Sequence, residues 1–139
     1  MALSAATAVV GVIGDPVAHS LSPRLHNRAF ADMGLDWVSV GFRVAAGRAG
    51  EALAGAATLG VRGLSVTMPH KDDVARLVDR RSPLAERLDT VNCVVFGETG
   101  TFGDSTDGPG LVAALRRGTD STRPGADVWW WAPEVRPGR

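Results

Sequence analysis

Residues 8–23, AVVGVIGDPVAHSLSP, join a short apolar run to a serine and a proline. The β-branched residues of 8–13 predict a strand buried on both faces, and the Gly-Asp-Pro at 14–16 ends it in a loop. Ser22 and Pro23 predict the start of a helix, because serine is a favoured N-cap and proline a favoured first helical residue. A buried strand followed by a loop and a helix is the unit from which α/β folds are built.

The same alternation continues to residue 117. Further strands are predicted over 37–44, 63–67 and 91–96, with a brief one in the glycine-rich 97–103. Helices are predicted over 22–33, 47–59, 69–78, 82–88 and 107–117. Helical crossovers between β-branched runs predict an α/β layer structure with a largely parallel sheet.

The composition is that of one soluble globular domain. With 139 residues, 45% of them hydrophobic and 22% charged, the chain is unlike disordered, collagen-like or transmembrane sequences. Fifteen Lys and Arg residues balance fifteen Asp and Glu residues, so no net field recruits nucleic acid or a membrane surface. The N-terminus lacks the basic segment of a signal peptide, and we expect a cytoplasmic protein. A lone Cys93 excludes an internal disulfide and a cysteine-rich zinc site, and the three histidines have no metal-site spacing.

Polar residues follow three of the predicted strands. They lie at 19–23, 65–71 and 105–108, and Asn92 stands at the start of a fourth strand. In α/β sheets, ligands bind outside the carboxyl ends of the strands. These segments offer hydroxyls, an amide, an amine and a carboxylate, which suit a small polyhydroxylated acid.

Each of these residues also has a purely structural interpretation. Ser22 could be only an N-cap, and Asp107 could cap the helix that follows it. Lys71 could be a solvated helix residue. Asn92 could satisfy a turn, and Thr67 could pair along a strand. The local patterns leave these alternatives open.

Four motifs together resemble the N-terminal substrate-binding domain of shikimate dehydrogenase. Residues 14–23 resemble its G-x-P-x-x-H-S-x-S-P, and 65–71 resemble its N-V-T-x-P-x-K. Residues 90–92 resemble its A-V-N-T, and 103–110 resemble its G-x-N-T-D-G-x-G. Four motifs in register over 12–115 are far more specific than any one of them. The resemblance implies a three-layer sandwich in which helices flank a mostly parallel, mixed sheet.

The resemblance also implies a role for each matching residue. Ser20 and Ser22 would hold the carboxylate of shikimate through their hydroxyls. Thr67, Asn92 and Asp107 would hydrogen-bond the ring hydroxyls. Lys71 and Asp107 would be the catalytic pair in the reduction of 3-dehydroshikimate by NADPH, where the ammonium stabilises the charge that develops on the ketone oxygen.

Two positions depart from the family pattern. Ser65 stands where the family has the asparagine before V-T, and Ser105 stands where it has the asparagine of N-T-D-G. Serine is shorter, so contacts made by those amides would be lost or bridged by water. The family also has a Rossmann domain for NADP(H), and we expect no cofactor-binding residues in these 139.

The last residues suggest a shifted reading frame. Tryptophan has the single codon TGG, so 128–132 must be encoded as GTN-TGG-TGG-TGG-GCN. When the reading frame is moved by two nucleotides and third codon positions are G or C, the codons of 128–139 encode V-V-V-G-A-G-G-A-A-R-A. This sequence contains the G-x-G-x-x-A motif of dinucleotide-binding domains. We therefore expect a substrate-binding domain at 1–118 and a non-native, poorly ordered tail at 119–139.

Three functions are compatible with these observations. The first is a shikimate dehydrogenase family member that carries only the substrate half-site. The second is a non-catalytic module that binds shikimate or quinate, and the third is an inactive fragment without a ligand. A tail that encodes a hidden dinucleotide fingerprint favours the first, because a selected binding module should end in a designed cap. The expected partner is a small-molecule substrate.

Overall fold

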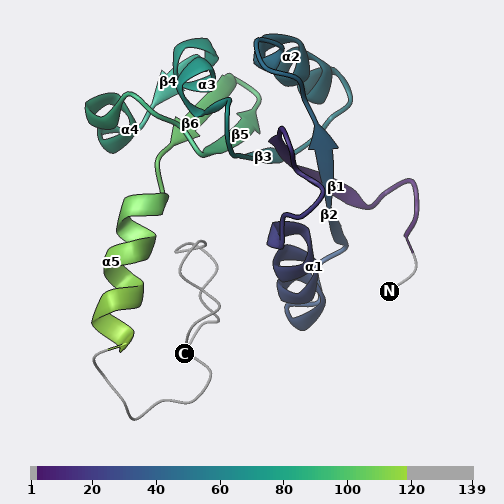
Figure 1. Cartoon of the computed structure of the whole chain (residues 1–139). Coiled ribbons are helices and arrows are strands. Elements are labelled where there is room, and N and C mark those ends of the chain that lie inside the picture. The colour runs from purple at the N-terminus through teal and green to yellow at the C-terminus, as the bar shows by residue number, and fades with distance from the viewer. Residues whose placement is uncertain (1–2, 119–139) are drawn as a thin grey trace. The chain divides into compact units, whose positions relative to one another are not determined.

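The computed structural model describes residues 3–118, which fall into two units (Figure 1). The first unit is 1–105, and the second begins at Thr106 and is described up to residue 118. The expected non-native tail, with its three tryptophans, lies outside the described residues.

The first unit is built around one six-stranded sheet in the order β2-β1-β3-β5-β6-β4. The pairs β1/β2, β1/β3 and β4/β6 are parallel, while β3/β5 and β5/β6 are antiparallel. Helix α1 covers one face, and α2, α3 and α4 cover the other (Figure 1). The expected α/β sandwich with a mixed sheet is therefore confirmed. The strands are β1 (Ala8–Gly14), β2 (Trp37–Arg43), β3 (Gly63–Val66), β4 (Arg80–Arg81), β5 (Cys93–Gly97) and β6 (Gly100–Asp104). The helices are α1 (Ser22–Asp32), α2 (Ala49–Thr58), α3 (Lys71–Leu77), α4 (Pro83–Leu88) and, in the second unit, α5 (Asp107–Gly118).

Three differences from the sequence prediction concern the segments around α3 and β5. Helix α3 begins at Lys71 instead of Pro69, because residues 67–70 form a turn in which the His70 amide donates to the Thr67 carbonyl at 3.1 Å. The two-residue strand β4 was not predicted, since two arginines carry no apolar alternation. The residues before β5 lie outside the strand, and Val91 is fully buried there as part of the core.

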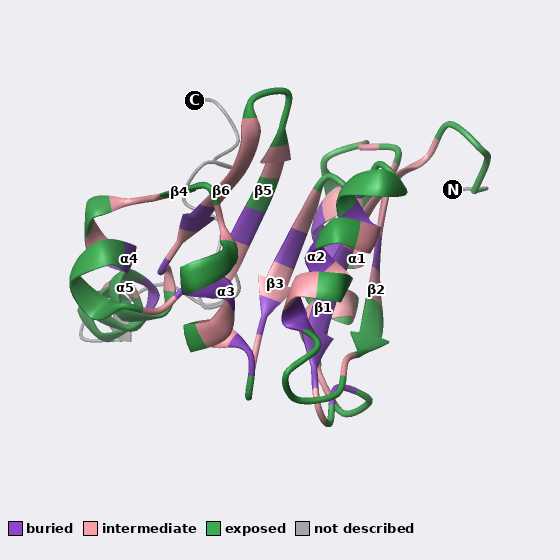
Figure 2. Cartoon of the chain, turned by 90° about the horizontal axis from the view of Figure 1, so that it is seen from above, coloured by how far each residue is buried: buried purple, intermediate pink, exposed green. Residues whose placement is uncertain are grey.

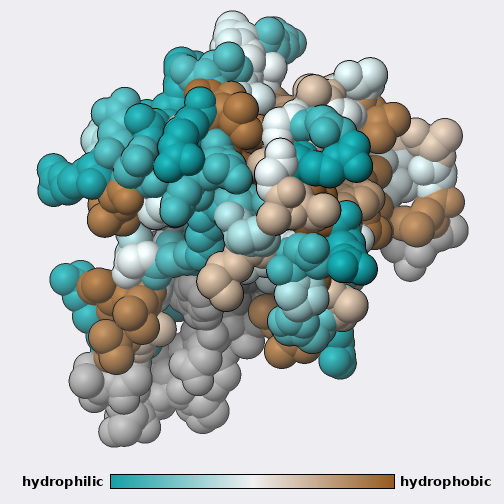
Figure 3. Space-filling view, turned by 45° about the horizontal axis from the view of Figure 1, so that its top comes forward, coloured by the Kyte–Doolittle hydropathy of each residue, from teal (hydrophilic) through white to brown (hydrophobic). Residues whose placement is uncertain are grey.

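The main hydrophobic core lies between the sheet and helices α2, α3 and α4. Alternate strand residues face it, as the period of two in a strand requires. Figure 2 shows the buried segments of β1 and β3 in purple beside these helices. The outer surface over α3 and α4 is largely hydrophilic (Figure 3), so both helices are amphipathic. The core residues include Ile13, Leu53, Leu64, Val66, Val74, Ala75, Ala85, Val91 and Val94.

Helix α1 is fastened to the edge strand β2 by two polar side chains. Asn27 donates from Nδ2 to the Ser39 carbonyl at 2.9 Å and accepts from the Ser39 amide at 2.7 Å. It thereby takes the place of a neighbouring strand at that residue. His26 Nδ1 shares a 3.0 Å hydrogen bond with the Ser39 hydroxyl, and both residues are buried. Since α1 begins at Ser22, this attachment fixes the helix that follows one of the polar segments.

The buried His26 makes the fold sensitive to acid. Burial lowers its pKa from the usual 6.5 to about 4, so His26 is neutral in the folded protein near neutral pH. Below pH 6.5, His26 binds a proton in the unfolded chain but stays neutral in the folded protein. The free energy of unfolding therefore falls until the pH approaches 4. Between pH 7 and pH 5 we expect His26 to remove about 2 kcal/mol from the free energy of unfolding.

Urea denaturation at the two pH values measures this loss. His26→Gln is the matched control, because it keeps a polar side chain that does not titrate, while every carboxylate contributes equally to both proteins. The stability of the variant should fall by about 2 kcal/mol less than that of the wild type over this interval. Equal losses in the two proteins would contradict the prediction.

Candidate functional site

The loops that follow β1 and β3 lie side by side at the carboxyl ends of these strands. Ile13 and Val66 are register partners in the parallel β1/β3 pair. Beyond them, the Thr67 amide donates to the Ile13 carbonyl at 3.0 Å, and the Asp15 amide donates to the Met68 carbonyl at 3.0 Å. The first two polar segments predicted from the sequence therefore leave the sheet at the same edge.

Backbone hydrogen bonds bring Thr67, Lys71 and Asn92 to this edge. The Val66 amide, next to Thr67, donates to the Asn92 carbonyl at 2.8 Å. The Val91 amide, next to Asn92, donates to the Lys71 carbonyl at 3.2 Å. All three candidate residues are half-buried. The structure thus gathers residues from three segments, as the resemblance implies, around one point of the sheet edge.

Ser20 and Ser22 lie on the loop that leaves the same edge after β1. The Ser20 hydroxyl accepts a hydrogen bond from the Ser22 amide at 3.3 Å. Ser22 is the first residue of α1, and the N-cap position is Leu21, which has no side-chain cap. The prediction that Ser22 is the N-cap is therefore wrong. Its hydroxyl, like that of Thr67, makes no hydrogen bond within residues 3–118, so both can bind a ligand.

Lys71 stands at the first position of α3. It is half-buried, which disagrees with the interpretation of a fully solvated lysine. It is also the only lysine among the fifteen Lys and Arg residues of the sequence. A chain that otherwise uses arginine keeps a lysine here, and only lysine offers a compact ammonium that can give up its proton. The presence of a single lysine is a signal in the sequence that a comparison of motifs does not detect.

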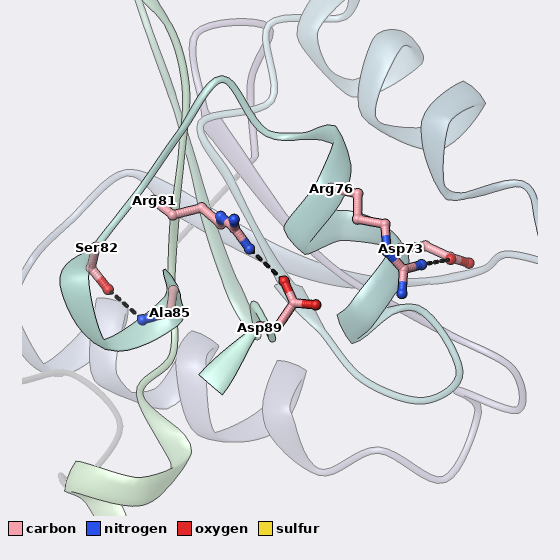
Figure 4. A network of polar contacts seen from close by, with 6 residues as sticks. All are labelled: Asp73, Arg76, Arg81, Ser82, Ala85 and Asp89. Atoms are coloured by element: carbon pink, nitrogen blue, oxygen red, sulfur yellow. Dashed lines mark hydrogen bonds and ion pairs between the residues drawn. The ribbon is translucent and has the colours of Figure 1, made fainter. Parts of the chain in front are cut away.

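The segment between α3 and Asn92 is held by local polar contacts (Figure 4). Ser82 is the N-cap of α4, and its hydroxyl accepts from the Ala85 amide at 3.1 Å. Arg81, before the helix, forms a 2.7 Å ion pair with Asp89, after it. Asp89 adopts the left-handed conformation, φ 48°, that ends α4. These contacts fix both ends of the helix that leads to Asn92.

The two serines that depart from the family pattern differ in burial. Ser65 is half-buried in β3, where its register partners are Val12 and Cys93. Ser105 is buried, and its amide donates to Asp104 Oδ1 at 2.8 Å. The backbone amide of Ser105 therefore makes a hydrogen bond within the protein, in addition to any contact of Ser105 with a ligand.

Asp107 begins α5 in the second unit and is exposed. The Gly110 amide donates to the Thr106 carbonyl at 2.9 Å in the first turn of this helix. The pairing of Asp107 with Lys71 remains a prediction.

Sequence reasoning missed one residue beside the site. It treated His70 as an ordinary polar residue, whereas the structure buries it completely, directly before Lys71. No local sequence signal marks such burial. Among residues 3–118, no group of three His, Cys, Asp or Glu side chains could hold a metal ion.

Comparison with known proteins identifies the family. The family model described as the shikimate dehydrogenase substrate binding domain matches residues 12–94, more than half of the chain. The chain belongs to the shikimate dehydrogenase family. The match covers the predicted motifs at 14–23, 65–71 and 90–92, so the resemblance read from the sequence is confirmed.

Relatives within the family extend beyond this chain. The shikimate dehydrogenase (NADP(+)) of Citrifermentans bemidjiense is 49% identical over 116 residues, which are 84% of this chain and 40% of that protein. A crystal structure of shikimate dehydrogenase in complex with NADP+ superposes with a TM-score of 0.81 at 38% identity, covering 84% of this chain and 40% of that one. Shikimate 5-dehydrogenase from Listeria monocytogenes, solved with shikimate and NAD, gives 0.80 at 37% identity over the same shares. The chain therefore spans about 40% of the length of the relatives it matches.

Proposed function

We propose that this chain is the substrate-binding part of an NADPH-dependent shikimate dehydrogenase, which reduces 3-dehydroshikimate to shikimate in chorismate and aromatic amino acid biosynthesis. The observation that carries the proposal is the gathering of Thr67, Lys71 and Asn92 at one edge of the sheet in a chain whose residues 12–94 match this family. A cytoplasmic location accords with such a role. Within residues 3–118 no helix has the length and apolar character that crossing a membrane requires.

The substrate's polar groups divide among the candidate residues. Ser20 and Ser22, on the loop between β1 and α1, would donate their hydroxyl hydrogens to the carboxylate of the ligand. Both are half-buried, and hydrogen bonds to a charged acceptor are stronger than neutral ones. Thr67 and Asn92 would bind ring hydroxyls, and the family resemblance implies the same role for Asp107.

Lys71 would act on the oxygen that changes during the reaction. A ketone oxygen becomes negative as it is reduced, and an ammonium beside it stabilises that charge and can supply the proton. Asp107 would orient the ammonium and the adjacent hydroxyl. Partial burial of Lys71 strengthens both effects, because fewer water molecules compete with its hydrogen bonds.

The described residues do not fit the dinucleotide itself. A dinucleotide needs a glycine-rich turn between a strand and a helix, so that the backbone can approach the pyrophosphate. Gly108, Gly110 and Ala113 have the required G-x-G-x-x-A spacing, but all three lie inside α5 instead of in a turn before it. NADP(H) binding is thus not assigned to residues 3–118, and no step through the cofactor is derived.

For the residues after 118 we propose a shifted reading frame, with the substrate-binding domain ending at about Gly118. The support is the codon argument: the run Trp129–Trp131 allows a second frame that encodes a dinucleotide fingerprint. Sequencing the gene across the codons for 115–139 tests this. Third bases that fail to give the glycines of the fingerprint would rule the proposal out.

Titration with shikimate tests the binding function, and the single lysine makes the test specific. Protein labelled with lysine that carries ¹³C only at Cε gives one lysine side-chain signal, which reports on Lys71 alone. We expect shikimate to shift this signal with a dissociation constant near the millimolar range, about −4 kcal/mol, since an open half-site leaves polar groups in competition with water. Quinate, titrated in parallel, defines the preferred acid. A Lys71 signal that neither acid moves would contradict the proposal.

Gly14 is expected to control the position of Thr67. A Cβ atom on Gly14 would lie 2.4 Å from Thr67 Cγ2, closer than two carbon atoms can approach. Gly14→Ala must therefore displace the Thr67 side chain, and we expect it to lower stability by about 1–3 kcal/mol and to weaken shikimate binding. Thermal unfolding and the lysine-signal titration measure the two effects.

Gly55→Ala is the matched control for this substitution. Gly55 lies within α2, and a Cβ there meets no atom within 4 Å. The added methyl group should raise stability by about 0.5–1 kcal/mol and leave shikimate affinity unchanged. Equal affinities of the two variants would show that Thr67 does not depend on Gly14.

A further inference from the structure

The ring of His70 is fully buried at the start of α3, and one of its nitrogens has a defined partner. Nε2 lies 2.8 Å from the carbonyl oxygen of Val44, 26 residues earlier in the chain. A carbonyl oxygen only accepts hydrogen bonds, so Nε2 carries the hydrogen and donates it. Val44 directly follows β2, and the bond therefore connects the end of an edge strand to the start of α3.

The environment of the other ring nitrogen, Nδ1, shows that packing alone does not favour a histidine at this position. Within residues 3–118, Nδ1 of His70 is a buried side-chain atom without a hydrogen-bond partner. An unpaired buried acceptor is unfavourable, and a phenylalanine ring of similar size would avoid it. What phenylalanine could not supply is the hydrogen for the Val44 carbonyl. The hydrogen bond to Val44 is thus the property that distinguishes histidine from phenylalanine at position 70.

Through Val44, this bond links the start of α3 to the end of β1. The Val44 amide donates to the Gly14 carbonyl at 3.1 Å, and Gly14 opens the loop that carries Ser20 and Ser22. On the other side, the His70 amide donates to the Thr67 carbonyl at 3.1 Å. The His70 carbonyl accepts from the Val74 amide at 2.9 Å and so begins the α3 hydrogen-bond ladder. His70 therefore holds the backbone immediately before Lys71 from both sides.

We propose that His70 is a positioning residue for Lys71. Its Nε2–H bond to the Val44 carbonyl fixes the first turn of α3 against the residue that follows β2, and this places the lysine ammonium at the substrate. His70 itself does not touch the substrate. The inference rests on the proposed function, because it concerns the same binding site.

Three substitutions separate positioning from general stability. His70→Gln keeps a donor nitrogen at the same number of bonds from the backbone as Nε2, so it can still reach Val44. His70→Phe keeps the ring but has no donor, and His70→Asn has a donor that is one bond too short. Val74→Ala is the control: Val74 is fully buried in the same helix but donates nothing to Val44 through its side chain.

The readouts are thermal unfolding and titration with shikimate, followed through the Lys71 ¹³C signal. We expect His70→Phe and His70→Asn to weaken shikimate binding by about tenfold or more, and His70→Gln to stay within about threefold of the wild type. Val74→Ala should lower the melting temperature without changing the affinity. Should His70→Phe fail to fold, the comparison of His70→Asn with His70→Gln decides the matter.

Two results would overturn the inference while leaving the proposed function intact. One is wild-type affinity in both His70→Phe and His70→Asn. The other is an affinity loss in Val74→Ala as large as in the His70 variants, which would mean that binding merely follows stability. A wild-type protein whose Lys71 signal ignores shikimate would contradict the proposed function itself, and this inference with it.

Discussion

A polypeptide of residues 1–139 will show no NADPH oxidation in the presence of 3-dehydroshikimate. Hydride transfer needs the two reactants held within contact distance, which accounts for about 7–11 kcal/mol of many enzymatic rate enhancements. Residues 3–118 contain the proposed substrate half-site, but their G-x-G-x-x-A spacing lies inside α5 and not in a turn before a helix. The absorbance of NADPH measures the reaction, and the full-length Citrifermentans bemidjiense relative is the positive control.

A chimera makes this prediction sharper. Residues 1–118 joined to the remainder of that relative would combine the half-site proposed here with the part of the relative that lies beyond the match. We expect turnover to appear in the chimera and to be absent from the 139-residue polypeptide under the same conditions. Comparable turnover by both proteins would show that the shorter chain binds the cofactor in a way that residues 3–118 do not reveal.

Replacement of Lys71 is expected to have the second largest effect. In the chimera, Lys71→Ala should lower kcat by a factor of about 10²–10⁴, the usual contribution of a positioned acid or electrostatic group. In the 139-residue polypeptide, Lys71→Ala and Asp107→Ala should each remove detectable shikimate binding, measured by calorimetry or NMR. Lys71→Arg should not restore activity, because a guanidinium keeps its proton and has a different shape.

Arg76→Ala is the control for the loss of a positive charge. Arg76 lies on the same helix as Lys71, is exposed, and pairs with Asp73 at 3.3 Å. Its removal changes the net charge as much as Lys71→Ala does, yet exposed ion pairs contribute little to stability. We expect unchanged kcat and affinity in Arg76→Ala. Losses that match those of Lys71→Ala would reduce the role of Lys71 to a general effect of charge.

The fold was largely predictable because its signals are local. The apolar run at 8–13 became the interior strand β1, and Ser82-Pro83 became the start of α4, with Ser82 as its N-cap. The start of α3 was misjudged because Pro69 is compatible both with a first helical turn and with the turn that the chain makes after β3. Strand β4 was missed because its two residues form a strand only by backbone pairing with β6, and the local sequence does not show this pairing.

The candidate site was predictable as a set of residues and not as an arrangement. The motifs singled out Thr67, Lys71 and Asn92, and the structure gathers them at one sheet edge. The same motifs could not show that Leu21, and not Ser22, occupies the N-cap position of α1. They could not show that His70 donates to Val44 either, since that contact joins residues 26 positions apart.

The sequence by itself determined the order of the helices and of the strands other than β4, and the side chains available to a substrate. Both follow from properties that neighbouring residues share: apolar periodicity, capping, turn formation and the chemistry of each side chain. Only the tertiary structure decided which of these residues come to one sheet edge, which hydroxyls make no hydrogen bond within residues 3–118, and that His70 is buried. Those features depend on backbone hydrogen bonds and packing between segments distant in the chain, and a local pattern carries no information about its distant partners.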